Sequence, residues 1–266
     1  MAAEEVVVDT PVGPASAWLI PGAGGDGDHW AIHIHGLGSS RAGTLRGVQV
    51  ASEAGLTSLV VTYRNDGEGP TVGSGRSTLG ATETDDVRAA LRFALLRGAR
   101  RITLFGWSMG AAIALQLAAD AEFDGVVDRL VLDSPVLDWQ ATINANCARA
   151  GLPSWSGVFA RPWLQNRSLA RVAGLSSKVP LDEFGWLKRT SERSVPTLIL
   201  HGVEDESAPF EIARRLGELR PRGARLAAFH ATHTLSWNVD PIRWRSVVES
   251  CLTGSHDVWV SAPDHA

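Results

Sequence analysis

The chain has 266 residues, 44% of them hydrophobic and 20% charged, and a formal net charge of −4. This is the composition of an ordinary globular protein, and it excludes a disordered or fibrous chain. Lys and Arg form no block, so nucleic acid and an anionic membrane surface are not expected as partners. A small-molecule substrate is expected instead. Only two cysteines occur, Cys147 and Cys251, which favours a reducing compartment over a disulfide framework.

The first residues are acidic and lack the basic and apolar regions of a signal peptide. No apolar stretch reaches the ~18 residues that a membrane span needs. We therefore expect a cytoplasmic protein that does not use a membrane. Its aromatic content is compatible with an oligomer but specifies no symmetry.

The chain begins with an expected antiparallel hairpin at one edge of a sheet, because residues 6–8 and 16–20 flank a Pro/Gly turn. Six short apolar runs follow, each with the β-branched and aliphatic content of a buried parallel strand. These runs are residues 31–35, 58–63, 101–105, 129–132, 197–200 and 225–229.

Helical patterns alternate with these strands, which is typical of a mostly parallel, doubly wound α/β sheet covered by helices on both faces. The expected helices are residues 42–54, 82–96, 109–119, 208–219 and 241–251.

One interval, residues 134–195, breaks this alternation. A compact domain rarely contains so long a connection without secondary structure of its own. We call this interval the insertion and expect it to form a helical cap on a core domain made of residues 1–133 and 196–266.

The insertion contains four tryptophans, Trp139, Trp155, Trp163 and Trp186. Packing of the cap against the core domain accounts for them without any functional role. The alternative is that some of them line an apolar or aromatic substrate pocket. Both readings stay open, and Trp107 joins Trp139, Trp155 and Trp163 as a candidate pocket residue.

The strongest motif is Gly-Trp-Ser-Met-Gly at residues 106–110, directly after an expected strand and before a helix of small residues. A serine hydroxyl is a weak nucleophile, so an enzyme must expose it on a sharp turn beside a base and oxyanion donors. Glycines two residues on either side of Ser108 leave room for that turn. A plain strand-to-helix turn is the competing interpretation.

With this motif in this context, the chain resembles the α/β-hydrolase family over nearly its whole length. The resemblance implies the α/β-hydrolase fold, with nucleophile, acid and base in the chain order Ser, Asp or Glu, His. The strand that ends in His-Gly at residues 201–202 is similar to the family's acid loop, and Asp205 stands at the acid position. Glu204 and Asp133 remain alternative acids.

The resemblance also implies a base after the last strand, where His-Ala-Thr-His occupies residues 230–233. His233 is the expected base, although family members usually have glycine where this chain has Thr232. His230 competes with it, but His230 directly follows the strand, where a side chain is expected to be packed. An imidazole can accept the serine proton and return it near neutral pH.

The turn His-Gly-Leu-Gly-Ser-Ser at residues 35–40 follows the strand at 31–35. In the family, such a turn donates one backbone N–H to the oxyanion and the residue after the nucleophile donates another. The resemblance therefore implies oxyanion donors at Leu37 and Met109. The absence of three consecutive glycines disfavours one lipase branch.

The other polar residues give weaker indications of a metal, cofactor or substrate site. His33 and His35 would share one face of a strand, but no acidic or His cluster completes a metal site, and no glycine-rich loop indicates a nucleotide cofactor. We expect neither metal nor cofactor. Arg64 and Asp66, around the polar turn at residues 65–70, are candidates for a substrate contact, although a solvated turn has the same composition.

The sequence thus predicts a serine hydrolase that cleaves an ester or thioester, free or carrier-bound, through an acyl-serine intermediate. An acyltransferase or cyclase would use the same residues with an acceptor other than water, and the sequence does not separate the two. Epoxide and halide hydrolases are disfavoured because Ser108 replaces their aspartate. A non-catalytic binding protein of this fold is the third class, but such proteins commonly lose a triad residue.

Overall fold

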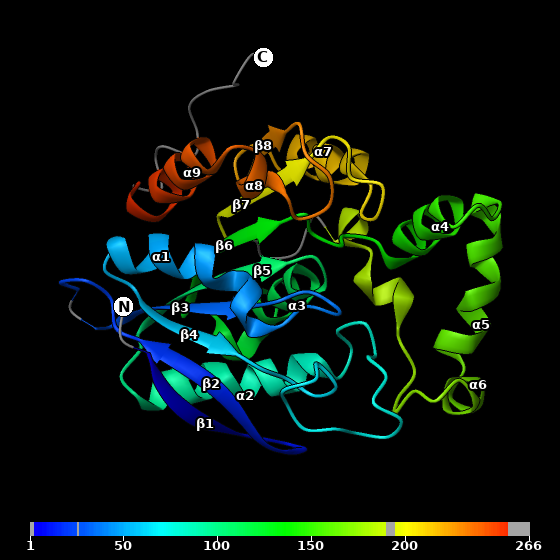
Figure 1. Ribbon diagram of the computed structural model, residues 1–266, viewed down its shortest axis with the longest axis horizontal. Helices are drawn as coiled ribbons and strands as arrows, with labels where there is room; N and C mark the ends of the chain where they lie inside the picture. Colours follow the sequence, from blue (N-terminus) through cyan, green and yellow to red (C-terminus); the bar gives the residue numbers. More distant parts are fainter. Residues whose placement is uncertain (1–2, 26, 190–194, 255–266) are drawn as a thin grey trace.

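The computed structural model describes residues 3–25, 27–189 and 195–254. An eight-stranded sheet, in the order β1-β2-β4-β3-β5-β6-β7-β8, forms its centre (Figure 1). The strands are β1 Glu4–Thr10, β2 Gly13–Ile20, β3 His29–Ile34, β4 Thr57–Val61, β5 Arg101–Trp107, β6 Val127–Asp133, β7 Thr197–Gly202 and β8 Ala224–Phe229.

The first two strands form the expected edge hairpin. They pair antiparallel from Glu4 opposite Leu19 to Thr10 opposite Gly13, and β2 then pairs antiparallel with β4. The turn needs Gly13, because its φ of +125° is a conformation that L side chains rarely adopt. This confirms the hairpin and its place at the edge of the sheet.

The other six strands are parallel, as expected from their apolar runs. Strands β3 and β7 are buried at every residue, which explains why their sequences do not alternate between apolar and polar. The expected strand at residues 58–63 is shorter than predicted: β4 ends at Val61, and Thr62 donates its backbone N–H to Ser16 O at 3.3 Å.

Helices cover both faces of this sheet. The buried apolar residues of α2 and α3 pack in one hydrophobic cluster, and Val50 and Ala51 of α1 pack with buried residues of α9 in a second one on the other face (Figure 1). The expected helix at residues 42–54 is divided into a 3₁₀ turn, Arg41–Thr44, and α1. The helices of the core are α1 Leu45–Glu53, α2 Glu83–Leu96, α3 Met109–Ala118, α7 Phe210–Leu219, α8 Ser236–Val239 and α9 Pro241–Thr253.

The described part of the insertion consists mainly of short helices, which Figure 1 shows grouped to one side of the sheet. Asp138 caps the first of them by accepting a hydrogen bond from Ala141 N at 3.0 Å. Residues 190–194 of the insertion lie outside the described residues. The helices are α4 Trp139–Arg149, α5 Ala160–Gln165 and α6 Arg167–Val172, with 3₁₀ turns at Ser154–Phe159, Leu181–Phe184 and Trp186–Lys188.

The carboxyl ends of the parallel strands meet at one edge of the sheet, where ligands bind in open α/β sheets. His35, Ser108, Asp205 and His233 all follow such strand ends. In the described residues, no helix is both long and apolar enough to cross a membrane.

Candidate active site

Ser108 lies on the sharp turn between β5 and α3, with a φ of +52° and a ψ of −114°. Few non-glycine residues adopt such a backbone conformation, and those that do cluster at functional sites. A Cβ on Gly106 would lie 2.5 Å from Ala111 Cα, and one on Gly110 would lie 2.1 Å from Ile34 O. The two glycines are therefore required by the close approach of β5, α3 and β3.

Three polar side chains from three strand ends form a continuous hydrogen-bonded chain. His233 Nε2 lies 2.8 Å from Ser108 Oγ, and His233 Nδ1 lies 2.7 Å from Asp205 Oδ2. With Nδ1–H donating to the carboxylate, Nε2 is left to accept the serine proton. The structure thus brings together three residues that lie far apart along the chain.

The Asp205 carboxylate receives more than one hydrogen bond. Oδ1 accepts from the backbone N–H groups of Ser207 and Ala208, each at 2.9 Å, and Oδ2 lies 3.2 Å from His201 Nε2. Burial raises the pKa of the Asp205 carboxyl, but hydrogen bonds from His201, His233 and Ala208 lower it by more. Asp205 is therefore ionised at neutral pH, as the partner of an imidazole must be.

The two alternative acids lie elsewhere. Asp133 is 1% exposed, and its Oδ2 accepts a hydrogen bond from Trp244 Nε1 at 3.0 Å. Burial raises the pKa of Asp133, and the smaller opposing effects of Arg46 and Trp244 leave it above its ordinary value. Glu204 is exposed. Only Asp205, of the three candidate acids, is within hydrogen-bond distance of His233.

The expectation that His230 is packed is wrong, because its side chain is exposed to solvent at the end of β8. The loop after it is held through the backbone of Thr234, whose N–H donates to Ser134 Oγ at 2.9 Å and whose carbonyl accepts from Arg46 Nη2 at 3.1 Å. These two contacts fix the residue next to His233. Sequence reasoning missed Ser134 and Arg46, which carry no motif.

The turn after β3 lies against the nucleophile. A Cβ on Gly36 would stand 3.1 Å from Ser108 Cβ, a tight contact, so glycine lets the turn lie close to the nucleophile without crowding it. In the described chain, no group accepts a hydrogen bond from the backbone N–H of Leu37 or of Met109, the first residue of α3. Both donors are free to bind a substrate oxygen.

A cavity of about 460 Å³ opens beside Ser108 and His233. Its wall is mostly apolar and comes from the turn at Leu37, from Leu79 and largely from α4 of the insertion. The α4 residues in the wall are Trp139, Thr142, Ile143, Asn146 and Cys147.

The four candidate pocket tryptophans differ in position. Trp139 is 5% exposed and lines this cavity. Trp107 is buried and lines a separate cavity of about 160 Å³ on the side of Arg46. Trp155 and Trp163 are 63% and 46% exposed and are absent from the walls of both cavities.

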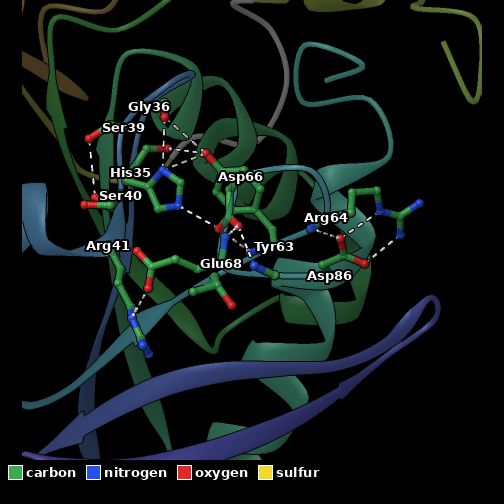
Figure 2. A network of polar contacts seen from close by, with 12 residues as sticks. His35, Gly36, Ser39, Ser40, Arg41, Tyr63, Arg64, Asp66, Glu68 and Asp86 are labelled. Atoms are coloured by element: carbon green, nitrogen blue, oxygen red, sulfur yellow. Dashed lines mark hydrogen bonds and ion pairs between the residues drawn. The ribbon is translucent and has the colours of Figure 1, made fainter. Parts of the chain in front are cut away.

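The remaining polar candidates have partners within the protein. Burial lowers the pKa of His33 to about 3, and its Nε2 lies 3.0 Å from Ser58 Oγ. Arg64 binds Asp86, and Asp66 binds His35, so neither points to a substrate (Figure 2). Among the described residues, no three His, Cys, Asp or Glu side chains gather as a metal site would need.

The geometry agrees with a family assignment from sequence. The model of the "Alpha/beta hydrolase family" matches residues 19–264, so the chain belongs to that family. Protein ABHD12B of Homo sapiens is 28% identical over 200 residues, which are 73% of this chain and 50% of that protein. The chain thus spans about half the length of this curated relative.

Solved structures show the same fold. An esterase of Pyrococcus furiosus is 21% identical, with a TM-score of 0.72 over 94% of this chain and 92% of its own. A puromycin-hydrolyzing peptidase of Mycobacterium tuberculosis is 18% identical, with a TM-score of 0.69 over 94% of this chain and 38% of its own. The family match makes the protein an α/β hydrolase, and these neighbours share its fold.

Proposed function

We propose that the protein is a serine hydrolase that cleaves carboxylic esters or thioesters through an acyl-serine intermediate. The observation that carries this proposal is the hydrogen-bonded chain from Ser108 through His233 to Asp205, with distances of 2.8 Å and 2.7 Å. It ends on a serine that faces an apolar cavity. Such an arrangement turns a weak nucleophile into a strong one.

The reaction then has two halves. Ser108 Oγ attacks the acyl carbon while His233 Nε2 takes its proton, and the Leu37 and Met109 N–H groups bind the oxyanion. Collapse of this tetrahedral species breaks the bond to the leaving group, which receives the proton from His233. A water molecule attacks the acyl-serine in the same way, with His233 as base, and releases the acid and free Ser108.

The cavity supports an apolar acyl group. Its volume of about 460 Å³ lies within the range of small-ligand pockets, and its wall contains Leu37, Leu79, Val136 and Trp139. An acyl chain or aromatic acyl group in this cavity would place its carbonyl at Ser108. The wall does not specify whether the leaving group is an alcohol or a thiol.

A fluorophosphonate probe tests the nucleophile. The expected result is one labelled peptide, containing Ser108, and no label in Ser108→Ala. Ser39→Ala is the control, because it removes another hydroxyl at the same edge of the sheet and leaves the chain from Ser108 to Asp205 intact. Label on another residue, or none on an active enzyme, would contradict the proposal.

Partitioning tests the intermediate and the acceptor. Two esters with one acyl group and different leaving groups are hydrolysed in buffer that contains methanol. A common acyl-serine predicts the same ratio of methyl ester to free acid from both esters, and different ratios would contradict it. Exclusive transfer to methanol, with no free acid, would replace water by another acceptor and favour an acyltransferase.

A further inference from the structure

Three side chains beneath the turn at Leu37 have no part in the mechanism above. They are Asp66, His35 and Tyr63, which Figure 2 shows in contact with one another. His35 Nε2 lies 3.0 Å from Asp66 Oδ2, and His35 Nδ1 lies 2.9 Å from the Tyr63 hydroxyl. His35 and Tyr63 are 1% and 2% exposed, and the Asp66 side chain is 2% exposed, so water does not compete for these contacts.

The contacts converge on the carbonyl oxygen of Gly36. This oxygen lies 3.0 Å from His35 Nδ1, and it can accept from the Tyr63 hydroxyl at 3.3 Å. It also accepts from Ser39 N at 3.2 Å. The Tyr63 hydroxyl lies 3.0 Å from the neighbouring carbonyl, His35 O. Two buried side chains therefore lie within hydrogen-bond distance of two consecutive carbonyl groups of the turn. The Tyr63 hydroxyl has a single hydrogen and donates to one acceptor at a time.

The Gly36 carbonyl and the Leu37 N–H belong to one peptide group. That group is planar and trans, so its C=O and N–H point in opposite directions. Whatever fixes the direction of Gly36 O also fixes the direction of Leu37 N–H. The carbonyl faces His35 and Tyr63, and the N–H on the opposite side is one of the two proposed oxyanion donors.

The charge of Asp66 supports this arrangement. Asp66 accepts hydrogen bonds from the backbone N–H groups of Tyr63, Glu68 and Gly69 at 2.9, 2.9 and 2.6 Å. Burial raises the pKa of the Asp66 carboxyl, but its hydrogen bonds from His35 and the backbone lower it by more. Burial, aided by Asp66 and Glu83, raises the pKa of Tyr63 well above its ordinary value, so Tyr63 keeps its proton.

We propose that Asp66, His35 and Tyr63 are positioning residues for the oxyanion donor at Leu37. Asp66 accepts a hydrogen bond from His35 Nε2 and so orients the imidazole. With both ring nitrogens as donors, Nδ1 donates to the Gly36 carbonyl, and the Tyr63 hydroxyl donates its one hydrogen to the adjacent His35 carbonyl. The peptide group between Gly36 and Leu37 then aims its N–H at the substrate oxygen. This role rests on the acyl-serine mechanism proposed above. A donor fixed in advance stabilises the charge that develops in the transition state, so losing its support lowers kcat rather than raising KM.

A matched control lies at the same strand end. Arg64 and Asp86 form a buried ion pair, with Arg64 Nε 2.7 Å from Asp86 Oδ2 and Arg64 Nη2 2.6 Å from Oδ1. Among the described residues, the hydrogen bonds that Asp86 accepts come from Arg64 alone. Asp86→Asn therefore weakens a buried pair close to Tyr63 without touching the Gly36 carbonyl.

The experiment compares Tyr63→Phe, Asp66→Asn and Asp86→Asn at a temperature well below the melting midpoint of each. The measurements are kcat and KM for an activated ester, and the inhibition constant of a trifluoromethyl ketone with the same acyl chain. The serine oxygen adds to the carbonyl of this ketone and forms a tetrahedral adduct with an oxyanion. The adduct therefore binds through the same donors as the transition state.

Loss of a whole oxyanion donor costs about 10²–10³ in kcat, and loss of its support should cost about 10-fold or more. Tyr63→Phe and Asp66→Asn should show this loss, with KM within about twofold of the parent and a similar rise in the inhibition constant. Asp86→Asn should lower the melting midpoint and leave kcat and the inhibition constant unchanged.

A folded Tyr63→Phe with the parent's kcat and inhibition constant would overturn the inference. An Asp86→Asn variant whose kcat falls and whose inhibition constant rises as much as in Asp66→Asn would also overturn it. If Asp66→Asn does not fold, Tyr63→Phe decides, because it removes only one hydroxyl. Failure of the proposed function is seen separately, as wild-type protein that fluorophosphonate does not label at Ser108; labelled wild type with unaffected variants contradicts the positioning role alone.

Discussion

Asp133 is the last residue of β6 and Asp205 lies three residues after β7, at the carboxyl ends of neighbouring parallel strands. Their surroundings shift their pKa values in opposite directions. Asp205 accepts hydrogen bonds from His201, His233 and two backbone N–H groups, and these lower its pKa despite burial. Asp133 is bound by one indole N–H, and burial dominates and raises its pKa. The sequence left both residues open as the acid, because the distinction depends on donors supplied by other segments.

This difference predicts that the two aspartate-to-asparagine variants differ in activity. Asp205→Asn should lower kcat by about 10⁴, because the amide no longer holds His233 in the tautomer that accepts the serine proton. Asp133→Asn should lower it far less. The measurement is kcat/KM for one activated ester with both variants. An inactive Asp133→Asn beside an active Asp205→Asn would show that the assignment of Asp205 as the acid is wrong.

The same difference predicts opposite dependences of stability on pH. The lowered pKa of Asp205 stabilises the fold above the ordinary carboxyl pKa of about 3.9, and this contribution is lost as the pH falls toward the folded value. The raised pKa of Asp133 has the reverse effect: its ionisation destabilises the fold as the pH rises through its folded value.

Melting midpoints from pH 3 to pH 7 check this prediction. Relative to the parent, Asp205→Asn should become less stable as the pH rises, because Asn resembles the protonated acid. Asp133→Asn should become relatively more stable over the same range. Parallel curves for the two variants would contradict the opposite pKa shifts.

At the scale of secondary-structure elements, α4 connects the insertion to the proposed chemistry. Trp139 begins this helix and lines the cavity beside Ser108, whereas Trp155 lies on the 3₁₀ turn that follows and is largely exposed. The sequence offered both as pocket residues because composition alone does not tell which face of a short helix is covered. That the insertion acts as a cap with control over the substrate remains a proposal.

The two tryptophans provide a test of that proposal. Trp139→Leu should change the ranking of a short-chain, a long-chain and an aromatic ester by kcat/KM, because the smaller side chain enlarges the cavity. Its stability cost should stay below the ~3–5 kcal/mol of a full truncation to alanine. Trp155→Leu should leave the ranking unchanged. An unaltered ranking in Trp139→Leu, with only a lower melting midpoint, would make this residue part of the scaffold.

Strands and long helices were predictable because each carries a periodic or continuous apolar signal. The six parallel strands and the edge hairpin all form, with ends that differ by a few residues. Contacts between distant side chains carry no such signal. His35 and Asp66, for example, meet because β3 and β4 are paired, and Arg46 reaches Thr234 across the face covered by α1.

At the scale of the whole molecule, the parallel sheet determines where the chemistry lies. Strands β3, β5, β7 and β8 end at the same edge, so the short turns after them bring together residues that are far apart in sequence. Motifs within one turn, such as Gly-Trp-Ser-Met-Gly, could be recognised from the sequence alone. The choice of Asp205 and His233 also required the family's chain order, since their distances depend on the packing of the full sheet.

Ser108→Ala tests the central claim, nucleophilic catalysis by this serine, most directly. The variant should fold, because alanine removes a single oxygen, and its melting midpoint checks that it does. Its kcat for an activated acyl ester should fall by about 10⁴–10⁶, the usual cost of removing a triad nucleophile. Near-normal turnover by a folded Ser108→Ala protein would contradict the account.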